Sequence, residues 1–205
     1  MSILDGKLVA EKIQLEVGQE IERLRSERGL VPGLAVIFPH KQMKILPYNR
    51  VVKDLNGLTR TDFLAHVSEH FTCEETQEQV PVKPREFSMY VAGQWYRLRA
   101  KPGSFNAADA IASLDVSILQ NNLLDPVLGI HDPRTDKRID FVGGIRGTAE
   151  LEKKVDDGKF AVAFSLRPTT IEQLFAVADA GKIMPPKSTW FEPKLKDGLV
   201  SHLLD

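Results

Sequence analysis

The 205-residue sequence predicts a mixed α/β fold, in which a mixed sheet contains a β-hairpin and a C-terminal βαβ unit and follows an N-terminal amphipathic helix. Three observations lead to this prediction: apolar residues at helical spacing near the N-terminus, a two-residue turn signal between strand-like runs, and alternating strand and helix patterns in the last third. Hydrophobic residues make up 42% and charged residues 27% of the chain, which is ordinary for a globular protein.

The N-terminal segment, residues 1–32, is predicted to be a helix that precedes a single mixed α/β domain over residues 33–205. Asp5 is the candidate N-cap, and Gly29 ends the helix because glycine readily adopts the left-handed conformation found at helix C-termini. The residues that recur every three or four positions and form the apolar face are Val9, Ile13, Val17, Ile21 and Leu24.

The middle of the chain contains several strand-like runs. Residues 34–38 and 43–46 have strand length and are expected to pair with each other. Residues 87–91 and 94–98 flank Ala92-Gly93, a two-residue hairpin signal that predicts antiparallel pairing.

Helical patterns lie on either side of this hairpin. Helices are expected over residues 61–71 and 106–124, where apolar residues recur at helical spacing. Residues 74–84 are polar and have no period, so they are expected to form an exposed loop.

The last third alternates between strand and helix. A strand at 139–142, a helix at 148–157 and a strand at 160–164 together predict a βαβ unit with parallel pairing. Another helix follows, for which Thr169 and Glu172 are the expected capping box.

Charge and cysteine content restrict the class of protein. The chain has 27 Lys and Arg against 28 Asp and Glu, so no nucleic-acid partner is expected, because a protein that binds nucleic acid by electrostatics carries a basic domain. The single cysteine, Cys73, fits a reducing compartment. Neither a secretory leader nor a membrane span is evident, so we expect a cytoplasmic protein without a membrane partner, and a homo-oligomer is left open.

One histidine pattern has metal-binding spacing. His66 and His70, in the order His-Val-Ser-Glu-His, match the H-x-x-E-H pattern of inverted zinc peptidases, since a spacing of four places both imidazoles on one helix face. No acidic partner motif follows, so surface histidines and no metal are expected. The sequence identifies no cofactor.

A glycine-rich turn is the first candidate anion site. Gly143, Gly144, Arg146 and Thr148 lie between a predicted strand and a predicted helix. Backbone N–H groups at a helix N-terminus attract anions, and a guanidinium adds a bidentate donor. The alternative interpretation is a tight turn in which Thr148 is an ordinary N-cap.

A proline-rich loop near the C-terminus is the second candidate. Lys187, Ser188, Thr189 and Lys194 offer ammonium and hydroxyl groups to phosphate or carboxylate oxygens, and Trp190 could stack on a planar ligand. The alternative is a connection whose aromatic residues cover the edge of the sheet.

Two carboxylates lie in apolar surroundings. Asp115 and Asp140 must therefore be paired or have raised pKa values, and Arg50, counted among the anion-binding residues, is also their natural partner. Either carboxylate could be a general base, although a cap or an ion pair is favoured. No Cys/His or Gly-x-Ser-x-Gly arrangement supports nucleophilic catalysis, so catalytic residues are unknown.

Several motifs in order resemble a known bacterial family. They are Leu34-Ala-Val-Ile-Phe-Pro-His, Ile45-Leu-Pro-Tyr-Asn-Arg-Val-Val-Lys-Asp-Leu, Leu114-Asp-Val-Ser-Ile-Leu, Asp140-Phe-Val-Gly-Gly and Met184-Pro-Pro-Lys-Ser-Thr-Trp-Phe-Glu-Pro-Lys. Residues from about 33 onward resemble the C-terminal part of the family called domain of unknown function 1015. The resemblance implies an association with serine biosynthesis. It also implies an upstream Asp-Gly-His-His-Arg tract, similar to one in certain serine kinases, which this sequence lacks.

The first residues resemble a different family. Ile3-Leu-Asp-Gly-Lys, the predicted helix and Val31-Pro-Gly-Leu-Ala-Val-Ile resemble the start of methylenetetrahydrofolate dehydrogenase/cyclohydrolase. The Tyr-x-x-x-Lys motif of that family has no counterpart, because Tyr48 and Lys53 are five residues apart. Its dinucleotide-binding domain is also missing, so folate chemistry is not carried over. The two resemblances overlap at Leu34-Ala-Val-Ile, so a fused, truncated or artificial reading frame is expected.

Three functions follow as hypotheses. The first is binding of a small phosphorylated or carboxylated metabolite, related to amino acids or serine, between Arg146 and residues 187–194, by an incomplete enzyme fragment. The second is a non-catalytic structural or assembly module. The third, a folate dehydrogenase/cyclohydrolase, is disfavoured by the missing motif.

Overall fold

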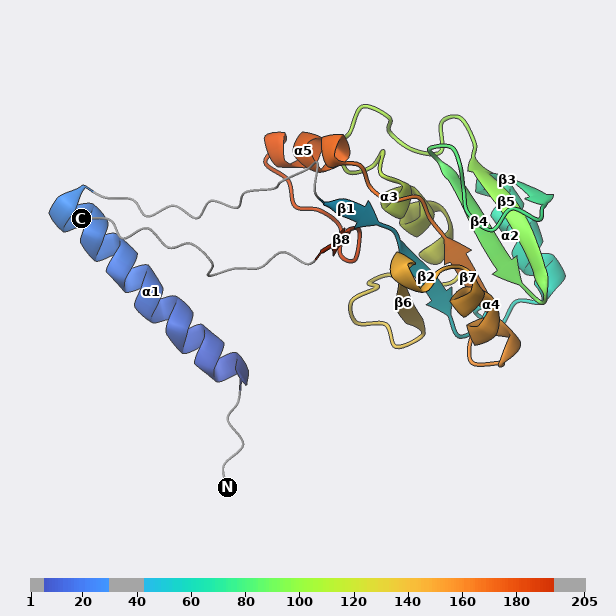
Figure 1. The fold of residues 1–205 in the computed structure, drawn as a ribbon, viewed down its shortest axis with the longest axis horizontal. Helices are drawn as coiled ribbons and strands as arrows, with labels where there is room; N and C mark the ends of the chain where they lie inside the picture. Colours follow the sequence, from blue (N-terminus) through green and yellow to red (C-terminus); the bar gives the residue numbers. More distant parts are fainter. Residues whose placement is uncertain (1–5, 30–42, 194–205) are drawn as a thin grey trace, which may run out of the picture. The chain divides into compact units, whose positions relative to one another are not determined.

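The computed structural model describes residues 6–29 and 43–193, and the chain divides into two compact units, Met1–Pro39 and His40–Asp205 (Figure 1). The division predicted at residue 33 and the strand predicted at 34–38 lie outside the described residues.

The first unit contains the helix α1 (Gly6–Arg28), which confirms the predicted N-terminal helix. Gly29 ends it as expected: its φ is 65°, and its amide donates to the carbonyl of Arg25 at 3.1 Å. The predicted cap Asp5 is outside the described residues. Along the exposed surface of α1, Arg23 pairs with Glu27 at 2.7 Å, an i,i+4 contact that supports the helix locally.

The second unit is built on a six-stranded sheet with the order β3-β5-β4-β7-β2-β6 (Figure 1). Every neighbouring pair in this sheet is antiparallel. The strands are β2 (Tyr48–Val52), β3 (Phe71–Glu75), β4 (Glu86–Val91), β5 (Gln94–Ala100), β6 (Ile139–Gly143) and β7 (Val162–Ser165). A separate two-stranded sheet pairs β1 (Lys44–Leu46) with β8 (Trp190–Glu192).

The predicted hairpin is confirmed, since β4 and β5 pair on either side of Ala92 and Gly93. Both turn residues have positive φ, 49° and 80°, which suits a two-residue turn whose twist matches that of the strands. By contrast, β3 occupies the first residues of the segment 74–84 that was predicted to be a loop.

The mixed α/β class is confirmed, but the predicted parallel pairing in the last third is wrong. The elements β6, α4 (Ala149–Asp156) and β7 follow one another as expected. However, β2 lies between β6 and β7 and is antiparallel to both, so these two strands run in the same direction without touching. The unit is thus a split βαβ, and the strand that separates its halves comes from residues 48–52.

The remaining helices differ from the sequence in their boundaries. The helix α2 (Arg60–His70) agrees with prediction. The helix predicted over 106–124 is reduced to α3 (Asp115–Leu119) and a π-helical turn (Gln120–Leu124), because the side chain of Asp109 accepts from the amides of Ile111 and Ala112 and so forms a turn instead.

The helix α5 (Ile171–Asp179) begins one residue later than expected. Its capping box joins Thr170 to Gln173, not Thr169 to Glu172. The hydroxyl of Thr169 instead donates to the carbonyl of Ser188 at 3.0 Å, inside the protein.

Two hydrophobic clusters cover the two faces of the six-stranded sheet. Neighbouring residues on one strand point to opposite faces, and accordingly Val52 belongs to the larger cluster and Val51 to the smaller one. The larger cluster is closed by α2, α3 and the π-helical turn, and the smaller one by Leu151 and Val155 of α4.

Phe63 tests the larger cluster. Its ring, on the first turn of α2, is fully buried, so we expect Phe63→Ala to lower the free energy of unfolding by about 3–5 kcal/mol. Urea denaturation measures this change. Phe175→Ala on α5 is the matched control, because Phe175 is 48% exposed and should cost less than about 1 kcal/mol. Equal losses at the two positions would contradict this assignment of the core.

Candidate functional site

A cavity of about 780 Å³ opens beside the sheet, a volume within the range of small-molecule sites. Its walls come from three stretches of chain, residues 109–121, 131–134 and 182–186. Arg50, on β2, is the one lining residue that the sheet itself supplies. The cavity therefore combines a rigid base with walls formed mostly by turns.

The guanidinium of Arg50 is buried without a carboxylate. The residue is 4% exposed, and it donates from Nη1 to the carbonyl of Tyr48 and from Nη2 to the carbonyl of Lys187, the latter at 3.2 Å. The guanidinium carbon lies 5.6 Å from the centre of the Phe141 ring. Among residues 6–29 and 43–193, no Asp or Glu pairs with it.

Burial lowers the pKa of Arg50 to about 10, so the side chain remains charged at neutral pH. Burying an unpaired charge is unfavourable unless hydrogen bonds and a ligand compensate for it. Among the described residues, Arg50 is thus a buried cation without a carboxylate partner.

The predicted partnership of Arg50 with Asp115 or Asp140 is wrong. Asp115 accepts from the amide of Arg85 at 2.9 Å, and burial raises the pKa of its carboxyl. Asp140 is exposed and lies 3.9 Å from the ammonium of Lys154. Side chains alternate between the two faces of a strand, and Asp140 is on the side that faces solvent, where a charge needs no buried partner.

The other cations that line the cavity are already paired. Lys182 lies 2.5 Å from Asp109, and Arg134 lies 2.9 Å from Asp132. The hydrogen bond from Lys182 lowers the pKa of Asp109 to about 2, and the amides of Ala112 and Ile111 act in the same direction. The Lys182–Asp109 pair joins two walls of the cavity, whereas the Arg134–Asp132 pair lies within one loop, and each of these charges has a partner.

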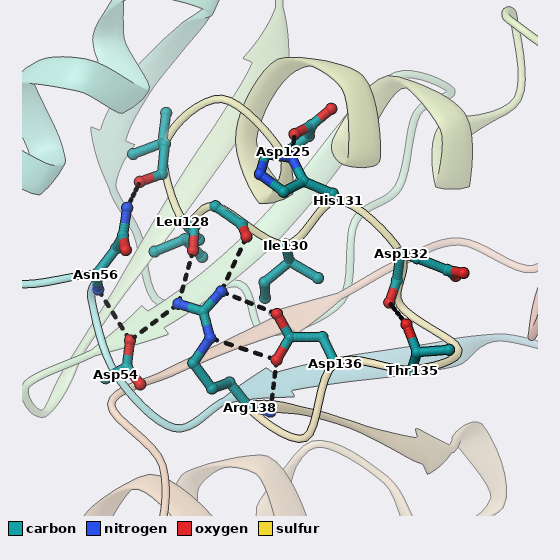
Figure 2. A network of polar contacts seen from close by, with 12 residues as sticks. Asp54, Asn56, Asp125, Leu128, Ile130, His131, Asp132, Thr135, Asp136 and Arg138 are labelled. Carbon is teal, nitrogen blue, oxygen red and sulfur yellow. Dashed lines mark hydrogen bonds and ion pairs between the residues drawn. The ribbon is translucent and has the colours of Figure 1, made fainter.

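The wall at 131–134 is positioned by Arg138, as Figure 2 shows. Its guanidinium donates to the carbonyls of Leu128 and Gly129 at 3.0 and 2.9 Å and to the carboxylate of Asp136 at 2.9 Å. It also lies 3.4 Å from Asp54, at the end of β2. Arg138 therefore contacts the loop on both sides of residues 131–134, at 128–129 and at Asp136, and connects it to Asp54, which follows the strand that carries Arg50.

His131 is held at the cavity wall by Asp125. The Nδ1 atom of His131 hydrogen-bonds to Oδ1 of Asp125 (Figure 2), while 83% of the His131 side chain is exposed. Asn56 donates to the carbonyl of Val127 at 3.2 Å, and this hydrogen bond helps to fix the turn between Asp125 and His131. The imidazole is thus oriented by a carboxylate, with its other nitrogen unconstrained by this contact.

The glycine-rich turn meets the proline-rich loop at one edge of the sheet. A Cβ on Gly143 would lie 2.5 Å from the Trp190 ring, and one on Gly144 would lie 2.6 Å from the ring of Pro47. The amide of Gly144 donates to the carbonyl of Pro47 at 2.8 Å. Close packing therefore accounts for both glycines, and an anion at this turn stays a prediction.

The other residues of this turn point in different directions. Arg146 is exposed and does not line the cavity. The Thr148 hydroxyl does not cap α4 and instead donates to the side-chain oxygen of Gln79 at 2.7 Å.

The predicted lysine loop contacts Arg50 through a backbone carbonyl, and the side chains of residues 187–189 do not line the cavity. Lys187 is exposed, has a φ of 53° and holds its ammonium 5.6 Å from the centre of the Tyr48 ring. Its carbonyl accepts a hydrogen bond from Arg50. Ser188 is buried, Thr189 is half-buried, and Lys194 lies outside the described residues. Of the eight described residues predicted to bind an anion, Arg50 is the one that lines the cavity.

No metal centre is found in the described part of the chain. His66 is paired with Glu69 at 3.0 Å on the surface of α2. Within residues 6–29 and 43–193, no three or more His, Cys, Asp and Glu side chains are grouped so as to hold a metal ion. In the same residues, no helix combines the length and apolarity that a membrane span requires.

Comparison with known families identifies the chain. The family described as "Protein of unknown function (DUF1015)" matches residues 10–117, just over half of the sequence. The chain belongs to this family. The resemblance noted from the motifs is thereby confirmed, while the motifs at 140–144 and 184–194 lie beyond the matched residues.

The similarity of the first residues to another protein is short. A stretch of 35 residues is 49% identical to "Bifunctional protein FolD" of Streptococcus agalactiae, and a stretch of 35 residues is 51% identical to "Bifunctional protein FolD 2" of Myxococcus xanthus. In both cases the match covers 17% of this chain and 12% of the relative, so this chain spans only a small part of the length of these proteins.

Solved structures with a similar arrangement include a free serine kinase variant in complex with AMP and a conserved hypothetical protein from Pyrococcus furiosus. The TM-scores are 0.47 and 0.48, with 14% and 12% sequence identity. The alignments cover 77% of this chain and 58% and 60% of the two structures.

Sequence reasoning missed most of the cavity residues. Asp109, His131, Arg134 and Lys182 lie in turns, where no hydrophobic period predicts their location. The density of Asp, Pro and Arg over residues 131–138 signals a turn-rich loop, but not the direction in which its side chains point.

Arg138 tests the support of the cavity wall. Removing its guanidinium leaves the carbonyls of Leu128 and Gly129 without this donor and leaves Asp136 with the backbone amide of residue 138 alone, so we expect Arg138→Met to lower the free energy of unfolding by about 2–3 kcal/mol. Hydrogen exchange of the amides at 129–136 should accelerate in parallel.

The control for this change is Arg134→Met on the same loop. Asp132 is the one ion-pair partner of Arg134 in the described part of the chain, and the Arg134 side chain is 71% exposed, so we expect a loss below about 1 kcal/mol. If Arg134→Met destabilised the loop as much as Arg138→Met, the anchoring role of Arg138 would be refuted.

Proposed function

We propose that this chain binds a small anionic metabolite, carboxylated or phosphorylated, in the cavity lined by Arg50. The observation that carries the proposal is a buried guanidinium that lines an open cavity and has no carboxylate partner among the described residues. An anion that enters the cavity would supply the missing charge and accept from the N–H groups of Arg50 that the carbonyls of Tyr48 and Lys187 leave free.

The rest of the lining supports a metabolite and not a bare ion. Ile111, Val116 and Met184 offer apolar contact, while Ser117, Gln120 and Asn121 offer hydrogen bonds. This combination of apolar lining with a few polar groups is typical of sites for small organic molecules. The proposed site thus differs from the one predicted between Arg146 and residues 187–194, although the loop takes part through the Lys187 carbonyl.

Arg50→Met tests the proposal. Thermal shift and NMR titration of the full chain with phosphoserine, ADP, ATP and a panel of small carboxylates at millimolar concentration should show binding that the variant loses. We expect the loss to be at least about tenfold in affinity, because a charge-assisted, bidentate contact to an anion is removed.

Two comparisons make the result interpretable. Removing Arg50 takes away an unfavourable buried charge but also leaves the carbonyls of Tyr48 and Lys187 without this donor. Because these two effects oppose each other, we expect the free energy of unfolding of Arg50→Met to change by no more than about 1 kcal/mol. Arg146→Met, on an exposed side chain outside the cavity, should bind as the wild type does. Binding that survives Arg50→Met and is lost in Arg146→Met would instead support the site at the glycine turn.

A further inference from the structure

The charges around the cavity distinguish between the two classes of anion that the proposed function leaves open. Besides Arg50, the charged lining residues are Lys182 and Arg134, which are cationic, and Asp109 and Asp132, which are anionic. Lys182 is paired with Asp109 at 2.5 Å, and Arg134 with Asp132 at 2.9 Å. Each pair is neutral as a unit, so among these five lining residues the charge of Arg50 is the one that no partner balances.

His131 does not add to this positive charge. It lines the cavity and hydrogen-bonds to Asp125. If the imidazole is neutral, the pair carries the negative charge of Asp125, and if it is protonated, the pair is neutral. In both states the surroundings of Arg50 are no more positive than the Arg50 charge alone provides.

From this charge balance we infer that the cavity is built for a carboxylate, a single negative charge, and not for a phosphate dianion. A carboxylate supplies the single negative charge that neutralises Arg50, and its oxygens accept hydrogen bonds from the guanidinium. A phosphate ester carries about −1.5 to −2 at neutral pH, so its second charge would find no unpaired cation among the described residues that line the cavity. The apolar lining, with Ile111, Val116 and Met184, fits a short organic chain behind the carboxylate. This assignment rests on the proposed function and names its ligand class.

Three probes of similar length separate charge from shape. Butanoate and propanesulfonate each carry one negative charge, planar in the first and tetrahedral in the second, whereas propyl phosphate is close to a dianion at pH 7.5. NMR titration of the 15N-labelled full chain at fixed ionic strength, with the Nε–H signal of Arg50 as one reporter, gives the dissociation constants. We expect butanoate and propanesulfonate to bind with similar affinity, and propyl phosphate about tenfold more weakly.

Asp109→Asn is expected to change the preference of the cavity between butanoate and propyl phosphate. The asparagine oxygen can still accept from the amides of Ile111 and Ala112, so the turn is retained, while Lys182 loses its carboxylate partner. The cavity then carries a second free cation. We expect propyl phosphate to bind about tenfold more tightly than to the wild type, and butanoate to change by less than about threefold.

The matched control is Asp157→Asn. It frees an equivalent exposed cation, because Asp157 pairs with Lys159 at 3.6 Å, but neither residue lines the cavity. The ratio of the butanoate and propyl phosphate affinities should stay at its wild-type value. A general increase of positive charge on the protein would change this ratio equally in both variants.

The outcomes separate this assignment from the proposed function. A wild-type preference for propyl phosphate, or an affinity ratio that Asp109→Asn leaves unchanged, overturns the carboxylate assignment, and the anion site itself stands if Arg50→Met abolishes the binding. If none of the three probes binds at millimolar concentration, the carboxylate assignment is overturned. If, in addition, no compound of the wider panel binds in an Arg50-dependent way, the proposed function fails as well.

Discussion

Arg50 carries a positive charge into an inner strand of the sheet, where two backbone carbonyls and the face of Phe141 are its contacts. One of those carbonyls belongs to Lys187, more than a hundred residues away in the sequence, so the same side chain connects β2 to the loop that follows α5. A folded protein that needed this position only for stability would be served better by an apolar residue. The charge at this position is therefore better explained by the cavity, which Arg50 lines from its place on β2.

The walls of the cavity are held mainly by polar contacts, whereas its base is a strand of the sheet. They are turns held by side chains of opposite charge, such as Lys182 with Asp109, and by Arg138, which spans two carbonyls and a carboxylate. Such contacts specify direction more strictly than hydrophobic burial does, because each depends on the geometry of a donor and an acceptor. Loops positioned on a rigid sheet commonly carry binding residues, since the sheet supplies stability while the loops supply chemistry.

The sequence predicts local structure here better than it predicts the site. The hairpin about Ala92-Gly93 and the helix α2 follow from turn chemistry and helical spacing, both of which act within a few residues. The split βαβ unit does not, because the strand inserted between β6 and β7 comes from residues 48–52, which carry no βαβ signal of their own. For the site, Arg50 could be singled out as a cation in an apolar segment. Its neighbours Asp109, His131 and Lys182 could not, since only the tertiary structure brings their turns together.

The turn at Gly143 and Gly144 illustrates why a glycine pattern between a strand and a helix has two physical meanings. Such a turn can expose amides to an anion, or it can make room for another part of the chain. Here the Trp190 ring occupies the space beside Gly143, and the amide of Gly144 is used by Pro47. Glycines that admit an aromatic ring bring β8 against the end of β6, and this packing places the Lys187 carbonyl within reach of Arg50. The turn would thus contribute to the proposed anion site by positioning its neighbours, without itself having to touch the ligand.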